Sequence, residues 1–254
     1  MDVCGRSVSP NSLARKVGTE TMIGFDPLYF MMMIPPMLLA GWAQWKVSSA
    51  FRHGSEIRSS SGLTGAQAAQ RIMEAEGIYN VAIEPVEGML SDHYDPTHKV
   101  LRLSSQVYGS NSIAALGVAA HEAGHAIQDA NRYTMLVLRN AIVPVASFGS
   151  NASMMLIFAG AIFQMGGLIL LGVIAFSLGV IFQVVNLPVE FDASRRARNA
   201  LLMTGLVRPE EDREVGKVLN AAAMTYVAGT ITAIVTLLYY LIRLGVFGGS
   251  SNDE

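Results

Sequence analysis

The sequence predicts a mainly α-helical membrane protein in which four transmembrane helices carry a small portion of mixed α and β structure. Three observations lead to this prediction. The 254 residues are 51% hydrophobic and only 15% charged, whereas an average soluble domain is about 25% charged. No charged residue or histidine occurs in the 50 positions from Asn140 to Val189. The polar part of the chain contains His121-Glu122-Ala123-Gly124-His125, which is typical of a metal site on a helix.

The charge-free run is long enough to cross a membrane twice. One crossing requires about 20 apolar residues, and Met165-Gly166-Gly167 supplies turn residues midway along the run. Two further uncharged stretches, Pro27–Trp45 and Val218–Ile242, each suit one crossing. Buried helices of a globular core are the alternative for stretches of this kind. The predicted spans are approximately 27–45, 140–163, 168–188 and 219–243.

The distribution of basic residues predicts which side of the membrane carries the polar segments. Of the 18 Lys and Arg residues, 14 fall in the segments 46–139 and 190–217. The positive-inside rule therefore places these segments in the cytoplasm, with both termini outside, and we expect the plasma membrane as the site. We expect the polar segments 46–138 and 189–217 to form a single domain, 22–248, together with the spans. Residues 1–21 are polar, and we interpret them as a disordered leader or a start-site artefact.

Composition also limits the partners of the chain. The net charge is −2, and no basic cluster suggests a nucleic-acid surface. Cys4 is the only cysteine, so no disulfide within the chain is possible. The lipid bilayer is the partner that the composition implies.

The larger polar segment shows the pattern of a small α+β unit. Thr64 and Gln67 have capping-box spacing, which predicts a helix over 63–76. We expect strands over 81–86 and 100–103, a turn-rich segment over 90–96, and a second helix over 112–130.

The second helix carries residues with the spacing of a zinc hydrolase. His121 and His125 are four residues apart and therefore lie on one face of the helix, where both can bind a single Zn²⁺. Glu122 lies beside that face, in the position of a general base for a metal-activated water. A chance H-E-x-x-H is the alternative. It is disfavoured because the flanking residues are small and apolar, and burying three ionisable groups without a partner is costly.

A catalytic zinc requires a third protein ligand and one open position. Asp129 continues the histidine face, but it is about 12 Å along the helix from His121 and cannot share the ion with both histidines. His93 and His98 lie in the turn-rich segment, where solvated histidines are common. Glu190 is the favoured candidate because it is the first charge after the uncharged run and is expected to open a helix after Pro188. A carboxylate lying merely at the membrane interface is the alternative.

At this point the sequence resembles a known group of membrane proteases. The histidine motif, the apolar hairpin and the following glutamate resemble the HtpX and CAAX prenyl protease group of gluzincins, and the chain is more closely similar to the YugP-type neutral zinc metallopeptidases. The similarity extends over roughly 22–248. It rests on the segments SGLTGAQAAQRIMEAEGI (61–78), EGMLSDHYDP (87–96), AAHEAGHAIQ (119–128), LPVEFDASRRA (187–197) and AAAMTYVAG (221–229).

The resemblance implies a zincin-like cytoplasmic portion that holds one Zn²⁺ per chain and acts on peptide or protein substrates. It implies His121, His125 and Glu190 as ligands and Glu122 as the catalytic base. One position departs from the HtpX pattern, because Ser194 stands where an Asp follows the ligand glutamate. Asp192 could supply the supporting carboxylate instead, or Arg195 and Arg196 could form a different support.

Two further roles are open at this level. The segment Lys99–Ser104 precedes the histidine helix, and we expect it to be an edge strand that pairs with substrate; a purely structural strand is equally compatible. Hydrolysis also requires a donor for the developing oxyanion. The candidates for this donor are His93, Tyr226, Arg195 and Arg196.

These inferences together predict a membrane-embedded zinc endopeptidase. A non-catalytic scaffold or chaperone-like protein with structural zinc is the main alternative, although structural sites are usually closed by four ligands rich in Cys. A transporter or channel component is a weaker alternative, because the charge-free runs contain no ionisable residue that could mark an ion path.

Overall fold

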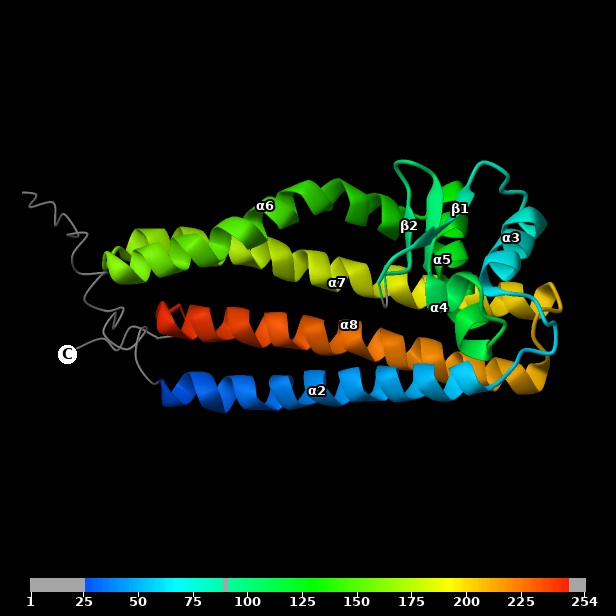
Figure 1. The fold of residues 1–254 in the computed structure, drawn as a ribbon. Coiled ribbons are helices and arrows are strands. Elements are labelled where there is room, and N and C mark those ends of the chain that lie inside the picture. Colours follow the sequence, from blue (N-terminus) through cyan, green and yellow to red (C-terminus); the bar gives the residue numbers. More distant parts are fainter. Residues whose placement is uncertain (1–25, 89–90, 247–254) are drawn as a thin grey trace, which may run out of the picture. The chain divides into compact units, whose positions relative to one another are not determined.

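The computed structural model describes residues 26–88 and 91–246, so the predicted leader, 1–21, lies outside the described residues. Four long helices account for most of the described chain (Figure 1). Each predicted span falls largely within one of them. The helices are α2 (Pro27–Glu56), α6 (Thr134–Ile162), α7 (Gly166–Met203) and α8 (Pro209–Arg243).

Three of these helices are long and apolar enough to cross a membrane. Within the described residues they are α6, α7 and α8. The remaining long helix is α2, whose uncharged stretch 27–45 is made less hydrophobic by Pro35, Pro36, two tryptophans and Gln44. The two prolines nevertheless lie inside a continuous helix, as the sequence predicts.

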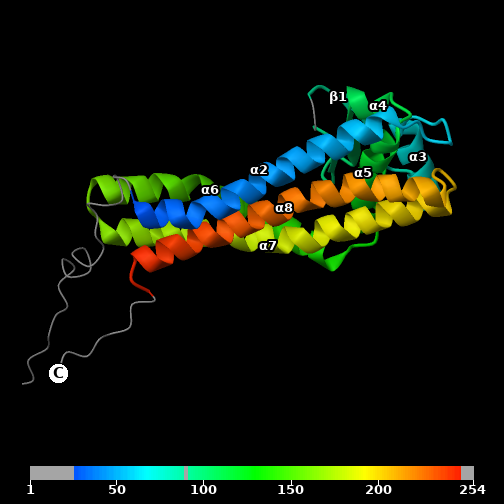
Figure 2. The same ribbon diagram turned by 90° about the horizontal axis from the view of Figure 1, so that it is seen from below.

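Helix α7 differs from the prediction at its polar end. We expected a span to end at Pro188 and a new helix to begin at Glu190, but α7 runs without interruption through both residues (Figure 2). A proline inside a helix removes one backbone donor and can be accommodated where neighbouring groups satisfy the freed carbonyl. Glu190 is therefore a mid-helix residue held on a rigid backbone.

The described chain divides into two compact parts. One comprises residues 26–38, 142–183 and 229–246. In it, Ile157, Ile169 and Val173 form a small buried cluster, and the Tyr239 hydroxyl donates a 2.7 Å hydrogen bond to Asp26. Many other apolar side chains of this part are exposed on α6 and α7. Exposed apolar faces on long helices are what a lipid environment requires.

The other part comprises residues 39–141 and 184–228 and contains all strands of the described chain. The strands are β1 (Ala82–Val86), β2 (His93–Asp95) and β3 (Val100–Ser104), in the order β1-β3-β2. β1 is parallel and β2 antiparallel to β3. The strands predicted over 81–86 and 100–103 are thereby confirmed.

Two predictions about this sheet are wrong. The segment Lys99–Ser104 was expected to be an edge strand, but β3 is central and pairs on both sides. The turn-rich segment 90–96 contains β2, because His93 to Asp95 pair with Arg102 to Val100. The edge nearest the histidine motif in sequence is consequently β2.

Three helices accompany the sheet. They are α3 (Gly65–Ala75), α4 (Ser105–Tyr108) and α5 (Ile113–Ala130). The capping box of Thr64 and Gln67 is present, and Ser112 caps α5 by accepting from the Ala115 amide. The small residues of α5 let it pack closely, so most of the helix is buried together with α3 and β3 in one apolar cluster. The two predicted helices of this segment are confirmed.

Candidate metal centre

The two motif histidines, His121 and His125, lie side by side on helix α5. Their rings are 4.9 Å apart between centroids and nearly perpendicular, at 82°. Glu122, beside them, is buried with 8% of its surface exposed. The helical spacing therefore produces the arrangement that the sequence predicts, with two imidazoles side by side and one carboxylate adjacent.

A close approach of α5 and α7 brings Glu190 to these histidines. A Cβ atom added to Gly124 would lie only 2.6 Å from the Ala193 carbonyl oxygen and 3.2 Å from its carbonyl carbon. Glycine at position 124 therefore allows the two backbones to touch between the motif residues and the glutamate. Glu190 lies three residues before Ala193 on α7 and is 4% exposed.

The three side chains form one donor cluster. One potential ligand atom from each of His121, His125 and Glu190 lies within 4.8 Å of the others. Glu190 Oε2 is 3.3 Å from His121 Nε2 and 3.7 Å from His125 Nε2. Ligands bound at about 2.0–2.1 Å in a tetrahedron are about 3.3 Å apart. The spacing and the donor set of two imidazoles and one carboxylate therefore fit Zn²⁺ with a fourth position open.

The other nitrogen of each histidine is held by a separate partner. His121 Nδ1 is 3.1 Å from Ser194 Oγ, and His125 Nδ1 is 3.0 Å from Gln128 Oε1. With the proton on Nδ1, each ring donates to its partner and leaves Nε2 free to bind a metal. Both Nε2 atoms face Glu190. Ser194, which departs from the HtpX pattern, thus contacts the first histidine directly.

Asp192 supports the second histidine indirectly. The fully buried Gln128 donates to Asp192 Oδ2 at 2.9 Å and to the Val189 carbonyl at 2.8 Å. Asp192 is in turn paired with Arg195 and Arg196. Asp192 therefore reaches the site through Gln128, and the two arginines reach it through Asp192. The two arginines neutralise Asp192, and Asp192 fixes the amide that orients His125.

A small cavity opens beside the donor cluster. Its volume is about 120 Å³, and Glu122 contributes to its wall together with all three potential ligands. The remaining lining residues come from the sheet edge and from α6 and α8; they are Asp92, His93, Tyr94, Pro96, Leu136, Arg139 and Tyr226. A base, a potential metal site and space for a reacting group are thus adjacent.

The electrostatics of the cluster favour a cation between the rings. Burial lowers the pKa of His125, but the hydrogen bond with Glu190 and the charge of Glu122 outweigh it and raise this pKa above its ordinary value. Two buried carboxylates in one small space require compensating positive charge. A divalent cation at this site would supply it.

The other histidines and Asp129 have separate contacts. Asp129 accepts from Tyr94 at 2.6 Å and is paired with Lys99, which ties β2 and the start of β3 to α5. Burial and the hydrogen bond to Asp129 raise the pKa of Tyr94 well above its usual range. Asp129 is therefore a structural residue, consistent with the distance argument made from the sequence.

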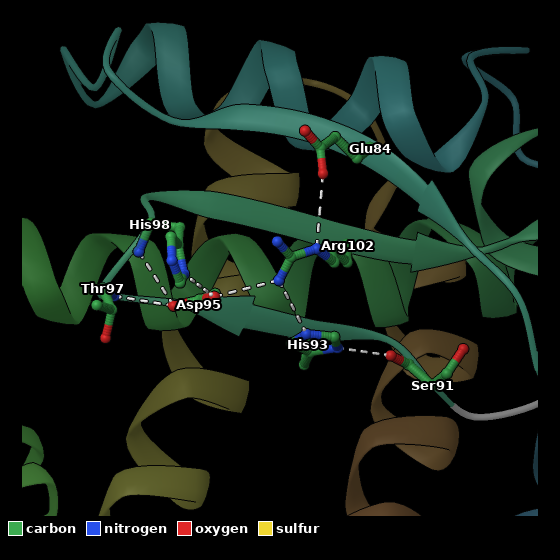
Figure 3. A network of polar contacts seen from close by, with 7 residues as sticks. All are labelled: Glu84, Ser91, His93, Asp95, Thr97, His98 and Arg102. Carbon is green, nitrogen blue, oxygen red and sulfur yellow. Dashed lines mark hydrogen bonds and ion pairs between the residues drawn. The ribbon is translucent and has the colours of Figure 1, made fainter.

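His93 and His98 belong to a polar network on the sheet (Figure 3). His98 Nδ1 is 2.7 Å from Asp95, which also accepts from Arg102 at 3.2 Å. His93 faces Arg102 from the other side, at 3.5 Å, and its Nδ1 is 2.7 Å from the Ser91 carbonyl. Among the described residues, neither histidine joins the donor cluster. His93 does line the cavity.

Sequence reasoning missed several residues around the site. Gln128 lies three residues after His125 on α5, so helical spacing alone could have indicated it. Arg139 lines the cavity from the second turn of α6, but no local pattern marks it. Arg195 and Arg196, which the sequence offered as oxyanion donors, pair with Asp192 and are absent from the described cavity wall.

A known protein family matches most of the chain. Residues 29–245 match the model of the family described as "Putative neutral zinc metallopeptidase". The chain belongs to this family. Membership of this family implies that the chain binds zinc. It also bears out the resemblance stated from the sequence.

A curated relative supports the same assignment. The chain is 46% identical over 215 residues to "Putative membrane protease YugP" of Bacillus subtilis (strain 168), covering 85% of this chain and 96% of the relative. That relative is named as a membrane protease, in agreement with the three apolar helices described above. No solved structure matches the chain significantly.

Proposed function

We propose that this chain is a membrane-embedded, zinc-dependent endopeptidase in which His121, His125 and Glu190 bind one Zn²⁺ and Glu122 is the general base. The observation that carries the proposal is the convergence of α5 and α7. It places three donor atoms within 4.8 Å of one another, with Glu122 in the same cavity wall. Family membership supports the metal and the reaction class.

Zinc at this donor set would polarise the peptide carbonyl and lower the pKa of a water molecule in the open position. Glu122 takes a proton from that water molecule as the water oxygen bonds to the carbonyl carbon. The same carboxyl group then gives the proton to the leaving amine when the C–N bond breaks.

The sheet suggests how a peptide reaches the cavity. β2 pairs with only one strand within the described chain, and His93 and Tyr94 from β2 line the cavity. An extended peptide can add to such an edge through backbone hydrogen bonds. The role first assigned to Lys99–Ser104 therefore passes to β2.

The membrane arrangement is also part of the proposal. We infer that α2 is a fourth span beside α6, α7 and α8. In its first half, Met31, Met37 and Leu38 are each at least 65% exposed, and its two prolines do not interrupt the helix. The excess of Lys and Arg in 46–139 and 190–217 supports a cytoplasmic active site in the plasma membrane. The family match over 29–245 supports one domain over 22–248.

The central test is the substitution Glu122→Gln in protein purified in detergent with its metal. Glutamine keeps the size of the side chain but cannot take a proton. We expect kcat for an unfolded substrate such as casein to fall by at least about 100-fold. Zinc content, measured by elemental analysis, should stay at one per chain.

Two further variants make the test specific. Glu76→Gln alters an exposed glutamate away from the cavity and should cleave at the wild-type rate. His125→Ala should lose both zinc and activity. Cleavage by Glu122→Gln at the wild-type rate would remove Glu122 as the base, and full zinc content in His125→Ala would refute the metal site.

A further inference from the structure

The cavity wall contains a cation to which the described reaction gives no role. Arg139 lies in the second turn of α6 and lines the cavity together with Leu136 of the same helix. Two buried side-chain atoms of the described residues have no hydrogen-bond partner, Arg139 Nε and Asn186 Oδ1. Only Arg139 belongs to the cavity wall. Arg139 therefore lines the cavity while its Nε has no acceptor among the described residues.

A structural explanation of Arg139 fits the observations less well. An arginine near the end of an apolar helix usually extends its guanidinium toward polar headgroups or water. Here the Nε atom is buried. The described residues offer Arg139 no ion pair within 4.0 Å, whereas Arg195 and Arg196 are both paired with Asp192. A buried guanidinium donor without an acceptor is costly, so its retention beside the base calls for a partner.

The charges in the cavity indicate which acceptor this is. Arg139 is the only arginine or lysine in the described wall, and it interacts electrostatically with the Tyr226 hydroxyl. Tyr226 in turn interacts with both Glu190 and Glu122. The guanidinium thus belongs to the group of side chains that surrounds the reacting centre. A peptide offers carbonyl oxygens as acceptors, and the oxygen of the bond being cleaved becomes negative during hydrolysis.

On the basis of the proposed peptidase function, we infer that Arg139 is a catalytic residue that binds the carbonyl oxygen of the scissile peptide bond and stabilises its developing negative charge. The guanidinium donates to the oxygen as water adds to the carbonyl carbon, and it releases the oxygen when the C–N bond breaks. Arg139 loses no proton in these steps. It complements Glu122, which moves the proton.

The test compares Arg139→Gln with wild type, using full-length, zinc-loaded protein in detergent and casein-derived peptides. Loss of an oxyanion donor costs about 100- to 1,000-fold in kcat. We expect a fall in kcat of about 100-fold or more, with KM changed only a few-fold. A phosphinic peptide built on the mapped cleavage site carries an anionic oxygen in place of the carbonyl. The inhibition constant of this compound should rise by about the same factor by which kcat/KM falls.

Control variants separate this role from a structural one. Arg132→Gln changes an exposed arginine outside the cavity wall and should keep wild-type kcat. Arg139→Lys keeps the charge but not the planar donor, and its kcat should lie between those of wild type and Arg139→Gln. If Arg139→Gln does not retain zinc, the role of Arg139 is tested by comparing kcat of Arg139→Lys with kcat of wild type. Guanidinium ions should partly restore kcat in Arg139→Ala and leave Arg132→Ala unchanged.

The contrary outcomes are distinct. Unchanged kcat and unchanged phosphinic-peptide binding in Arg139→Gln would overturn the inference. A rise in KM alone, or a loss confined to peptides with a free C-terminal carboxylate and absent for their amides, would show that Arg139 binds a terminal carboxylate instead. If wild type shows no Glu122-dependent cleavage, the proposed function fails and this inference fails with it.

Discussion

Replacing Gly124 by alanine inserts a methyl group where α5 touches the backbone of α7. The new Cβ would lie 2.6 Å from the Ala193 carbonyl oxygen, whereas ordinary contacts begin at 3.4 Å. The backbones must therefore separate by the difference, 3.4 − 2.6 = 0.8 Å, along that line. Overpacking of this kind costs about 1–3 kcal/mol. The higher helix propensity of alanine offsets up to about 1 kcal/mol of that cost.

The same displacement acts on the proposed metal site. Metal–ligand distances tolerate about 0.2 Å, and Glu190 lies on the helix that must move. We expect zinc affinity to fall by about 10- to 100-fold, comparable with the loss of a supporting contact. Cleavage should fall by about 100-fold at limiting zinc. Zinc affinity is measured by competition with a chromogenic chelator, and stability by thermal unfolding in detergent.

Gly117 offers a matched control on the same helix. A Cβ added there would meet only Val215 Cγ1, at 3.3 Å, which is the end of a side chain that can adjust. Gly117→Ala should therefore change stability slightly and leave zinc affinity intact. Wild-type zinc affinity and cleavage in Gly124→Ala would refute the argument that close contact of α5 and α7 sets the position of Glu190.

Two further predictions concern the groups around the site. Gln128→Leu removes the partner of His125 Nδ1 and leaves Asp192 without its amide donor, so zinc affinity should fall by about 10-fold or more in the chelator assay. Asp95→Asn tests the sheet network, in which the hydrogen bonds from His98 and then from Arg102 hold the pKa of Asp95 well below its ordinary value of 3.8. Because this pKa is depressed in the folded protein, wild type should be more stable than the variant above pH 4 and lose that advantage as the pH falls further.

The controls for these predictions are residues of the same type. Gln70→Leu removes an exposed glutamine of α3 that donates a hydrogen bond to Glu74, and its zinc affinity should equal that of wild type. Asp212→Asn alters a carboxylate outside the sheet that pairs with Arg198. A stability difference between Asp95→Asn and wild type that persisted unchanged at pH 2 would contradict the assignment to the Asp95 carboxylate.

The sequence predicted the local features of the site well because they depend on helical spacing. His121 and His125 lie on one face of α5, and the Thr64–Gln67 capping box forms as expected. Glu190 was singled out by its place after the uncharged run, and the structure does bring it to the histidines. The role of Glu190 as a metal ligand and the role of Glu122 as the base stay predictions, which the experiments above test.

The errors arose where a local signal was outweighed by packing. Pro188 suggested the end of a helix, but α7 continues because a proline removes only one donor from the backbone ladder. The turn residues around His93 concealed β2, which exists only because β3 is available to pair with it. Arg139 gains its significance from a cavity that several elements line, and Gly124 from its approach to Ala193 on α7. A single sequence does not show either arrangement.

The unbroken course of α7 has a consequence for how the family can vary. Glu190 and Ala193, the residue that touches Gly124, are joined by helical backbone and not by a loop. Each residue of a helix adds about 1.5 Å of rise and about 100° of rotation. An insertion or deletion of one residue between them would turn the carboxylate away from both imidazoles, and no adjustment of a flexible segment could return it. Length variation among relatives is therefore expected in the connections between helices and excluded from this three-residue interval.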